Sequence, residues 1–486
     1  MQMALTTRMT RSEHYKRYFM IVEQLYTNCL SEAAYFIADD GEAAVIDPLR
    51  DIDAYLQLAE KHDAKIKYIF ETHFHADFVS GHLDLAKATG ATIVYGPQTD
   101  ASFQFYMAKD GEVFTIGNLK IKAIHTPGHT LESTCYLLLD AEDREHSIFT
   151  GDTLFVGDVG RPDLFSGNMS KEELASMMYD SLNNKLKPLS DHVIVYPAHG
   201  PGSACGKSLG KETFSTIATQ KATNYALKDQ SREEFIKEVT SGLNAPPAYF
   251  PVNAQINAKG YESLDTIRAT ALQPLSVAAF EERVAGGAWI LDSRPSSVFT
   301  EGFVPESISI GLDGRFAEWA GSILPFDQEL VLVTEAGKEE ETVIRLARVG
   351  LDKVTGYLEG GFEAWQQAGK TIDLIIDVEP EELAMDIPFD NRLQVIDVRK
   401  PAEFESGHVK GAENIPLNEL SNPLHMAQID DDANLYVHCA GGYRSVIACS
   451  LMKKEGYHNL RNVLGGFGKI KEVKGMPVVL PSAAGA

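Results

Sequence analysis

The 486-residue sequence has few cysteines, no long apolar run and a deficit of basic side chains. Its five cysteines, odd in number and widely scattered, argue against a disulfide framework and favour a reducing, cytoplasmic compartment. No apolar run approaches the roughly 18 residues of a membrane-spanning helix, and residues 1–19 lack the apolar segment of a secretory signal. Since 44 Lys and Arg face 69 Asp and Glu, the net charge of −25 argues against nucleic-acid or anionic-membrane partners.

The apolar content of 44% is sufficient for ordinary cores, and the length predicts about three domains at roughly 150 residues each. The C-terminal half contains an internal repeat. Residues 288–295 resemble 393–400, and residues 359–362 resemble 464–467, both with an offset of 105 positions. Because two separate landmarks share one offset, we infer a duplicated domain of about 100 residues.

The chain is therefore predicted to be a multidomain α/β protein. Residues 1–245 form the largest unit, and the proline-containing segment 246–268 is a linker or docking extension that could also mediate pairing of two chains. Residues 269–376 and 377–486 are the duplicated domains. In both, short β-rich runs alternate with segments of helical spacing, which predicts sheets of mainly parallel strands.

Histidines and aspartates follow several predicted strands of the largest unit. Three of them share the loop Thr72-His73-Phe74-His75-Ala76-Asp77, and the others each come just after a further strand. Neutral imidazole and carboxylate are ligands for zinc, iron or manganese. The sequence therefore predicts a metal site at this edge of the unit. The candidate residues are His73, His75, Asp77, His129, Asp152 and His199.

The motif series HxHxD, GHT, GD and AHG resembles the metallo-β-lactamase superfamily over residues of about 18–240. The resemblance implies an αββα sandwich with metal at one edge of its two sheets, but not one particular reaction. Two-metal members usually carry a histidine where this sequence has Phe78, which has no donor atom. A single metal is therefore favoured, and two histidines with one carboxylate suit Fe(II) and dioxygen.

The same segment, with the loop 160–163, resembles the persulfide dioxygenase branch of that superfamily. This resemblance implies mononuclear non-haem Fe(II), with zinc as the alternative. Its implied ligands are His73, His129 and Asp152. The residues implied to line the site or to bond to the ligands are His75, Asp77 and His199. From the residues alone, His75 also remains open as a ligand.

Two further residues of this unit are candidates for the substrate site. Arg161 could pair with a substrate carboxylate or nascent anion, or it could brace its own loop through Asp163. Cys205, six residues past His199 in a Gly/Ser/Pro loop, could accept or relay a persulfide sulfur, or it could be an uninvolved loop cysteine. Cys29 and Cys135 are expected to pack against strands.

The segment 437–445, with Cys439, follows a predicted strand and begins a helix. Backbone N–H groups, the helix N-terminus and Arg444 could together stabilise a thiolate, a persulfide or a bound anion. The segment resembles the active loop of rhodanese sulfurtransferases, whose cysteine carries a sulfane sulfur, and the resemblance extends over about 378–480. It implies that Cys439 and Arg444 are catalytic. The cradle residues would be Ala440, Gly441, Gly442 and Tyr443.

The first copy of the repeat lacks this chemistry. The position equivalent to Cys439 is Thr334, and glutamates follow it where an anion cradle would be. No cysteine occurs between Cys205 and Cys439, so this copy is expected to be structural or to serve in docking. Cys449, further along the helix of the active copy, is expected to be buried and inert.

The whole arrangement resembles fusions of a persulfide dioxygenase with a sulfurtransferase. It implies that a glutathione- or coenzyme A-type persulfide is oxidised by O₂ to sulfite, and that Cys439 passes a sulfane sulfur to sulfite to give thiosulfate, in sulfide detoxification. One chain would raise the local concentration of the second reaction's partners. The alternatives are a zinc-dependent thioester hydrolase of the glyoxalase II kind fused to a sulfurtransferase, and a non-catalytic sulfide sensor.

Overall fold

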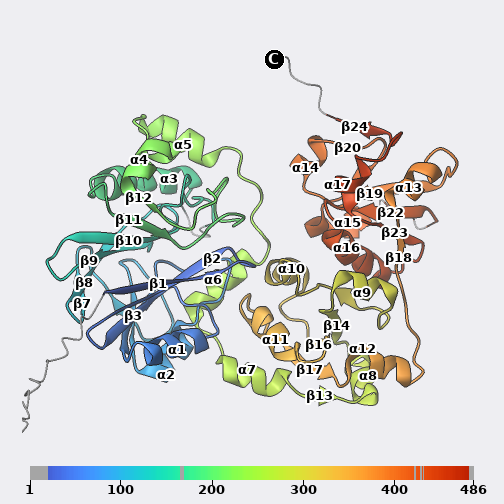
Figure 1. Cartoon of the computed structure of the whole chain (residues 1–486), viewed down its shortest axis with the longest axis horizontal. Coiled ribbons are helices and arrows are strands. Elements are labelled where there is room, and N and C mark those ends of the chain that lie inside the picture. Colours follow the sequence, from blue (N-terminus) through green and yellow to red (C-terminus); the bar gives the residue numbers. More distant parts are fainter. Residues whose placement is uncertain (1–19, 165–168, 421–422, 427–428, 431, 481–486) are drawn as a thin grey trace, which may run out of the picture.

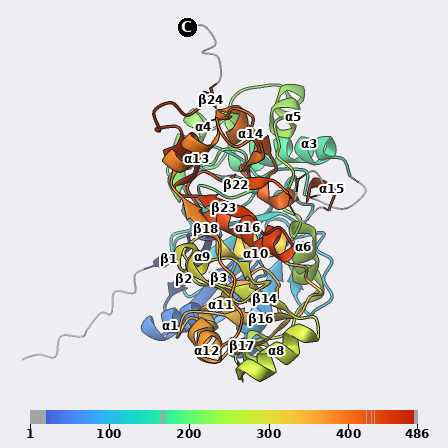
Figure 2. The same ribbon diagram turned by 90° about the vertical axis from the view of Figure 1, so that its right-hand side faces the viewer.

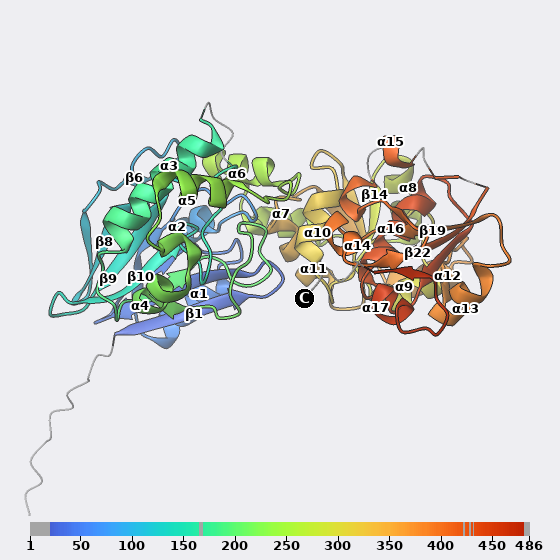
Figure 3. The same cartoon turned by 90° about the horizontal axis from the view of Figure 1, so that it is seen from above.

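The structure is a computed structural model that describes residues 20–164, 169–420, 423–426, 429–430 and 432–480. Residues 1–19, interpreted above as lacking a signal, lie outside this part. Figure 1 shows the N-terminal unit, in blue to green, beside two stacked C-terminal units in yellow to red. Figure 2 faces the stacked pair, and Figure 3 shows the two halves side by side. In the described ranges, no helix is long and apolar enough to cross a membrane.

Within the described residues, the N-terminal unit contains two six-stranded sheets that share an apolar core, including Tyr35 and Phe70 from one and Tyr136 and Phe149 from the other. The first sheet has the order β1 (Ile21–Thr27), β2 (Glu32–Asp39), β3 (Glu42–Ile46), β4 (Lys65–Phe70), β5 (Thr92–Tyr95) and β6 (Tyr106–Met107). The second has the order β12 (Ser215–Thr216), β11 (Ile194–Pro197), β10 (Glu145–Gly151), β9 (Thr134–Leu139), β8 (Leu119–His125) and β7 (Val113–Ile116).

Helices cover the outer faces of both sheets, so the αββα sandwich expected from the sequence is confirmed. The first sheet packs on Tyr55 of α1 (Asp53–Lys61) and Leu85 of α2 (His82–Thr89). The second packs on apolar residues that include Met178 and Phe235. They belong to α3 (Lys171–Ser181), the helical turn η1 (Leu182–Leu186), α4 (Ile217–Thr223), the turn η2 (Tyr225–Leu227) and α5 (Arg232–Thr240).

The two C-terminal units each contain a five-stranded sheet whose ladders, among the described residues, are parallel. The first has the order β13 (Pro274–Leu275), β17 (Val354–Leu358), β16 (Leu330–Val333), β14 (Trp289–Asp292) and β15 (Ile308–Ser309). The second has the order β18 (Ile376–Val378), β23 (Leu460–Val463), β22 (Asn434–His438), β19 (Leu393–Asp397) and β21 (Glu413–Asn414), beside a small ladder of β20 (His408–Val409) and β24 (Val478–Val479).

Helices flank both of these sheets. Those of the first C-terminal unit are α8 (Val277–Ala285), α9 (Ser296–Glu301), α10 (Phe316–Ile323), α11 (Glu339–Ala347) and α12 (Gly361–Gln367). Those of the second are α13 (Pro380–Asp386), α14 (Pro401–Glu405), the turn η3 (Leu417–Glu419), α15 (Pro423–Met426), α16 (Tyr443–Lys454) and α17 (Gly466–Ile470).

The two C-terminal units also repeat one buried ion pair. Arg294 Nε donates to Asp292 at 2.9 Å, and Arg399 Nε donates to Asp397 at the same distance. Each arginine lies over a phenylalanine ring, at 4.4 Å in the first unit and 4.1 Å in the second. Since both pairs obey the 105-residue offset, the structure confirms the duplication inferred from the sequence.

The segment between the halves is helical, with one buried face, rather than extended. It contains α6 (Phe250–Lys259) and α7 (Leu264–Ala271), and Figure 1 shows α6 between the N-terminal sandwich and α10. One apolar cluster runs from Phe78 and Phe155 through Tyr249 and Phe250 to Phe316. The docking alternative for this extension therefore describes it better than a free linker, because a free linker would not share a core with both halves.

Two reciprocal ion pairs join the N-terminal unit to the first C-terminal unit. The fully buried Arg50 donates to both carboxylate oxygens of Asp352, at 2.7 and 2.9 Å, and to the backbone carbonyl of Ala347 at 2.8 Å. Beside it, Arg348 donates to both oxygens of Asp51, at 2.7 and 2.8 Å. Charge-assisted pairs with two parallel bonds fix orientation as well as contact.

We expect Arg50→Ala to destabilise the contact between the halves by about 1.5–3 kcal/mol, because the partly buried Asp352 loses both of its charged hydrogen bonds to Arg50. Urea unfolding, followed by both tryptophan fluorescence and circular dichroism, should then show separate transitions for the two halves. The control is Arg144→Ala, since the Arg144 side chain is 70% exposed and makes only local pairs. A single transition at the wild-type midpoint in Arg50→Ala would contradict the proposed contribution of this pair.

Candidate metal centre and sulfur-carrier loop

The loops that carry the candidate ligands meet at one edge of the N-terminal sandwich. Strand β4 runs parallel to β3, and β10 runs parallel to β11, so the carboxyl ends within each pair lie together. His73 follows β4, Asp152 follows β10 directly, and His199 follows β11 by two residues. His129 comes from the loop after β8. The strand ends therefore bring together residues that are up to 126 positions apart.

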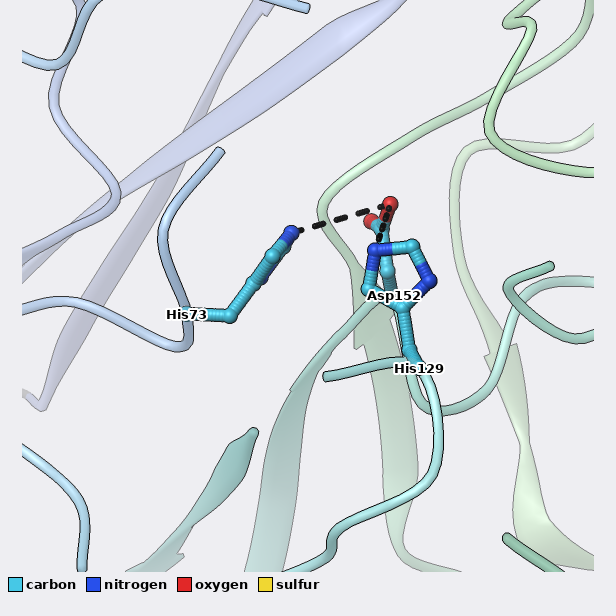
Figure 4. Close-up of side chains that lie close together, drawn as sticks. All are labelled: His73, His129 and Asp152. Atoms are coloured by element: carbon cyan, nitrogen blue, oxygen red, sulfur yellow. Dashed lines mark ion pairs between the residues drawn. The ribbon is translucent and has the colours of Figure 1, made fainter. Parts of the chain in front are cut away.

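Three of these residues form a compact buried group (Figure 4). His73 Nε2 lies 3.8 Å from Asp152 Oδ2, and His129 Nε2 lies 3.5 Å from the same oxygen. The other ring nitrogens are held by the protein. His73 Nδ1 donates to the Thr72 hydroxyl at 2.9 Å, since that hydroxyl itself donates to Asp47, and His129 Nδ1 donates to the Arg161 carbonyl at 2.8 Å. Both Nε2 lone pairs therefore face the group.

The residues fit a single metal ion. Asp152 Oδ2 is buried and has no hydrogen-bond partner in the described part of the structure. Burial opposes ionisation of Asp152, yet His199, His73 and His129 hold its pKa well below the usual range. Two imidazoles and one carboxylate with unused lone pairs match the donor set of mononuclear Fe(II) sites and also suit zinc.

A second buried group stands behind the first. His199 Nδ1 lies 2.7 Å from Asp152 Oδ1, and His199 Nε2 lies 2.7 Å from Asp77 Oδ2. Burial lowers the pKa of His199, but Asp152 and Asp77 outweigh it and raise that pKa well above its ordinary value. A protonated His199 between two carboxylates would fix the orientation of Asp152.

Cys205 belongs to this second group, with its sulfur near Asp77 and His199. It is 1% exposed, and burial together with Asp77 and Asp152 raises the pKa of its thiol well above the ordinary value. The structure thus places Cys205 beside the candidate metal centre, where its surroundings favour the thiol over the thiolate. Its role in accepting or relaying sulfur stays a prediction.

His75 faces a different set of partners. Its Nε2 lies 3.1 Å from Asp47 Oδ1 and 3.7 Å from Glu71 Oε2, and its ring packs on Phe78 with centroids 4.3 Å apart. It therefore lies outside the group formed by the first three ligands. His75 forms a separate group of possible metal ligands with Asp47 and Glu71, so its role stays a prediction.

The sequence analysis did not identify Asn257, which holds the loop 72–80 in place; this loop carries His73, His75 and Asp77 and is called the metal loop below. This fully buried residue of α6 donates to the backbone carbonyls of His75 and Phe78, both at 2.8 Å, and accepts from the Ser80 N–H at 2.9 Å. One side chain of the docking segment thus satisfies three backbone groups of the loop. The sequence held no signal for this, because Asn257 lies 177 to 182 residues from its partners in the loop, in an expected linker.

We expect Asn257→Ala to lower the free energy of unfolding by about 1–3 kcal/mol, because it leaves three buried backbone groups unpaired. A looser loop should also weaken metal retention, by roughly 10–100-fold. The matched control is Asn253→Ala, one turn earlier on α6, since the amide of this equally buried residue makes no hydrogen bond in the described structure. Equal metal affinity in the two variants, measured by competition with a chelator, would remove Asn257 from this role.

Arg161 adopts the bracing arrangement. Its guanidinium donates to both oxygens of Asp163, at 2.7 and 2.8 Å, and to the Asn244 carbonyl at 2.6 Å. Its side chain is only 4% exposed. The alternative in which Arg161 pairs with a substrate anion would require these bonds to be exchanged.

The loop at Cys439 turns sharply into α16. Gly442 adopts a left-handed φ of +113°, which suits glycine, and its N–H donates to Cys439 Sγ at 3.1 Å. The Ser445 hydroxyl lies 3.6 Å from the same sulfur. Cys439 itself is 1% exposed, whereas Ala440 and Gly441 are exposed. The helix start therefore supports the sulfur through backbone and hydroxyl groups.

Two side chains of this loop have partners outside it, and the roles predicted for Arg444 and Tyr443 stay predictions. Arg444 donates to both oxygens of Glu403, at 2.7 and 2.8 Å, rather than to the Cys439 sulfur. The Tyr443 side chain packs against the first C-terminal unit, and its hydroxyl donates to the Gly311 carbonyl at 2.7 Å. Glu403 binds Arg444, and the first C-terminal unit binds Tyr443. Neither partner could be identified from the loop sequence.

The remaining cysteines differ in burial, and the first copy of the loop has none. Thr334 comes directly after β16, as Cys439 comes directly after β22, so the first copy of the loop lacks a thiol at the equivalent place. Cys449 is fully buried in α16, and burial raises the pKa of its thiol. Cys135 is buried in β9, where burial raises its pKa to about 11. Cys29 is half-buried.

Comparison with known proteins identifies the domains. The family model of the metallo-beta-lactamase superfamily matches residues 27–199. A probable hydroxyacylglutathione hydrolase from Schizosaccharomyces pombe is 32% identical over 203 residues, which are 41% of this chain and 75% of that protein. The chain belongs to the metallo-beta-lactamase superfamily. The fold of this superfamily binds metal, in agreement with the donor group around Asp152.

The metallo-beta-lactamase domain is fused to two rhodanese domains, since the rhodanese-like domain model matches residues 276–368 and 379–472. A crystal structure of a metallo-beta-lactamase from Staphylococcus aureus subsp. aureus COL has a TM-score of 0.62 and 31% identity, over 71% of this chain and 99% of that one. Since residues 1–245 are about half of the chain, this match extends beyond the first domain. A structure of ETHE1 from Myxococcus xanthus has a TM-score of 0.42 and 34% identity, over 49% of this chain and all of that one.

Proposed function

We propose that this protein is an Fe(II)-dependent persulfide dioxygenase joined to a sulfurtransferase, acting in sulfide detoxification. The observation that carries the proposal is that one chain combines a two-histidine, one-carboxylate group with a cysteine held at a helix start. The first is the donor set of non-haem Fe(II) oxygenases. Phe78 supports a single metal, because it brings no donor atom to the motif position that supplies a second-metal ligand elsewhere in the superfamily.

In the first reaction, a thiol persulfide RSSH, O₂ and water would give the thiol RSH, sulfite and two protons. A bound Fe(II) would supply the redox centre for dioxygen activation, with positions left open by three protein ligands. The residues around the centre have separate tasks. His199 lies between Asp77 and Asp152 and holds Asp152 in place. The Thr72 hydroxyl sets the ring orientation of His73, and the Arg161 carbonyl sets that of His129. Their burial keeps bulk water from the ligands.

In the second reaction, Cys439 would attack the outer sulfur of a second RSSH, so that the S–S bond breaks and RSH leaves. The resulting Cys439 persulfide would give its outer sulfur to sulfite, which forms thiosulfate and restores the thiolate. The Gly442 N–H already points at the sulfur and would stabilise that thiolate. The sulfite consumed here is the product of the first reaction, which gives the fusion a chemical reason.

The test is oxygen uptake by the full-length protein, loaded with iron under reducing conditions and supplied with glutathione or coenzyme A persulfide. We expect oxygen consumption with sulfite and thiosulfate as products, and none after iron is replaced by zinc. Iron-loaded protein that consumes no oxygen with either persulfide would overturn the first step.

A second candidate is a zinc-dependent thioester hydrolase, favoured by the similarity to the Schizosaccharomyces pombe protein named as a hydroxyacylglutathione hydrolase. A zinc-activated water would attack the thioester carbonyl in that case. The cysteine loop has no part in thioester hydrolysis, so the fusion weighs against it. Hydrolysis of a hydroxyacylglutathione by zinc-loaded protein, together with inactivity of the iron form, would favour this candidate.

A further inference from the structure

A cavity of about 650 Å³ lies where the three domains meet. The metallo-beta-lactamase domain contributes residues 202–209 and 242–248 in part, the first rhodanese domain contributes α10, and the second contributes Lys400 and Pro401. This volume falls within the roughly 300–1,000 Å³ of small-molecule sites. The size and the shared walls suggest a ligand that the separate domains could not enclose.

The cavity leads toward the candidate metal centre. A narrow gap of about 10 Å³ shares Ser203, Ala204, Arg315 and Glu318 with the cavity, and it reaches Asp77, the carboxylate that bonds His199. Such a gap has room for about one water-sized group. The gap therefore marks the direction from the cavity toward Asp77 and His199, and the reactive end of a substrate would have to widen it.

Four basic and two acidic side chains line the cavity, an excess of positive charge in a chain whose net charge is −25. Among its lining residues, Arg161 is neutralised by Asp163 and Arg315 by Glu318. Among the described residues the two lysines form no such close ion pair. Lys207 donates to the Glu238 carbonyl, with the charges of Asp158 and Glu238 at longer range, and Lys400 is exposed at the start of α14. Low-dielectric walls strengthen the attraction of such charges for an anion.

Lys400 also lies close in sequence to a residue that contacts the Cys439 loop. Burial raises the pKa of Glu318, while Arg315, Lys400 and Arg444 oppose that rise, so these cations lie within electrostatic reach of one carboxylate. Lys400 is three residues before Glu403, which holds Arg444 of the Cys439 loop. The cavity wall is thus one short helix away from the sulfur-carrier loop.

We propose that this three-domain cavity binds the anionic body of the persulfide's thiol carrier, with Lys207 and Lys400 as the principal contacts. The inference rests on the proposed function for the identity of the thiol. The recognised groups are carboxylates in a glutathione-type carrier or phosphates in a coenzyme A-type carrier. Lys400 belongs to the second rhodanese domain, so that domain contributes a specificity residue to the substrate of the metal centre.

The test is equilibrium binding of the free thiols to the full-length protein by calorimetry. Coenzyme A, glutathione and the uncharged 2-mercaptoethanol are compared on wild type, Lys400→Gln and the control Lys410→Gln, an exposed lysine of the same domain outside the cavity. We expect Lys400→Gln to weaken binding of the anionic thiols about tenfold, since one charged hydrogen bond is lost. Tighter binding of coenzyme A would assign phosphate, and tighter binding of glutathione would assign carboxylate, as the favoured group.

The proposal is overturned if wild type binds neither anionic thiol, or if Lys400→Gln and Lys410→Gln bind them equally well. Kinetics separate this outcome from failure of the proposed function. Lys400→Gln should raise KM for an anionic persulfide about tenfold with little change in kcat. An unchanged KM with normal oxygen uptake would contradict the proposed carrier site but would support the dioxygenase activity. Binding of the thiols that depends on Lys400, without oxygen uptake, would support the carrier site and contradict the proposed dioxygenase activity.

Discussion

Replacing Asp152 with asparagine should abolish metal binding and, with it, all oxygen consumption. Asp152 Oδ2 is the oxygen on which His73 and His129 converge, at 3.8 and 3.5 Å. An amide keeps the shape but removes the negative charge, so the remaining donors are two neutral imidazoles. It also removes one of the two carboxylates that keep His199 protonated, which leaves that buried histidine without half of its charge compensation. The metal site therefore loses both a ligand and the support of that ligand.

The measurement is iron content after anaerobic loading and desalting, with oxygen uptake on the same samples. The matched control is Asp39→Asn, which neutralises another buried carboxylate at the opposite end of β2 from the bridge between Glu32 and His199. Circular dichroism should show that both variants keep the wild-type fold. If Asp152→Asn retained stoichiometric iron and full turnover, the assignment of Asp152 as a ligand would be wrong.

The metal loops were predictable because each candidate ligand follows a strand, and strand ends can be found from local composition. Parallel pairing of β3 with β4 and of β10 with β11 then places those ends at one edge. The duplicated domains were predictable for a similar reason, since two short motifs repeat at one offset. Both inferences depend on short-range patterns whose spatial consequences follow from sheet geometry.

The contacts that tie the domains together were not predictable from such patterns. Arg50 reads as a surface arginine in sequence, yet it is fully buried against Asp352, 302 positions away. Asn257 lies in a segment that reads as a linker, and it satisfies the backbone of the metal loop. The direction of Arg444 depends on Glu403, which belongs to another helix. Which distant polar side chains pair with one another depends on the assembled fold, and local sequence patterns do not contain that information.

These contacts suggest why the docking segment matters for chemistry as well as for stability. Helix α6 contacts the loop 72–78 through Asn257. Tyr249, which directly precedes the first residue of α6, packs on Gly321 of α10. A Cβ at Gly321 would lie only 3.0 Å from the Tyr249 ring, so the two halves approach closely at this point. Displacement of α10 would therefore reach the metal loop through a single helix, without passing through the sandwich core.

Replacing Cys439 with serine should remove thiosulfate formation and leave sulfite as the final product. The serine hydroxyl can still accept from the Gly442 N–H, which points at the sulfur over 3.1 Å, so the loop should keep its shape. It cannot carry a sulfane sulfur, because an oxygen at this position forms no persulfide. Oxygen uptake at the metal centre should continue, since Cys439 lies in a different domain from Asp152 and shares no ligand with it.

Product analysis by thiol derivatisation and chromatography checks this result, with Cys449→Ala as the matched control. Cys449 lies on α16, the helix that follows the Cys439 loop, and is fully buried. Its replacement removes a thiol but keeps Cys439 and its loop. Intact-mass measurement adds a direct readout, because wild type and Cys449→Ala should gain the mass of one sulfur atom on treatment with persulfide at Cys439. Enzymatic thiosulfate formation by Cys439→Ser at the wild-type rate would exclude Cys439 as the carrier and would leave Cys205, beside the metal centre, as the thiol to test next.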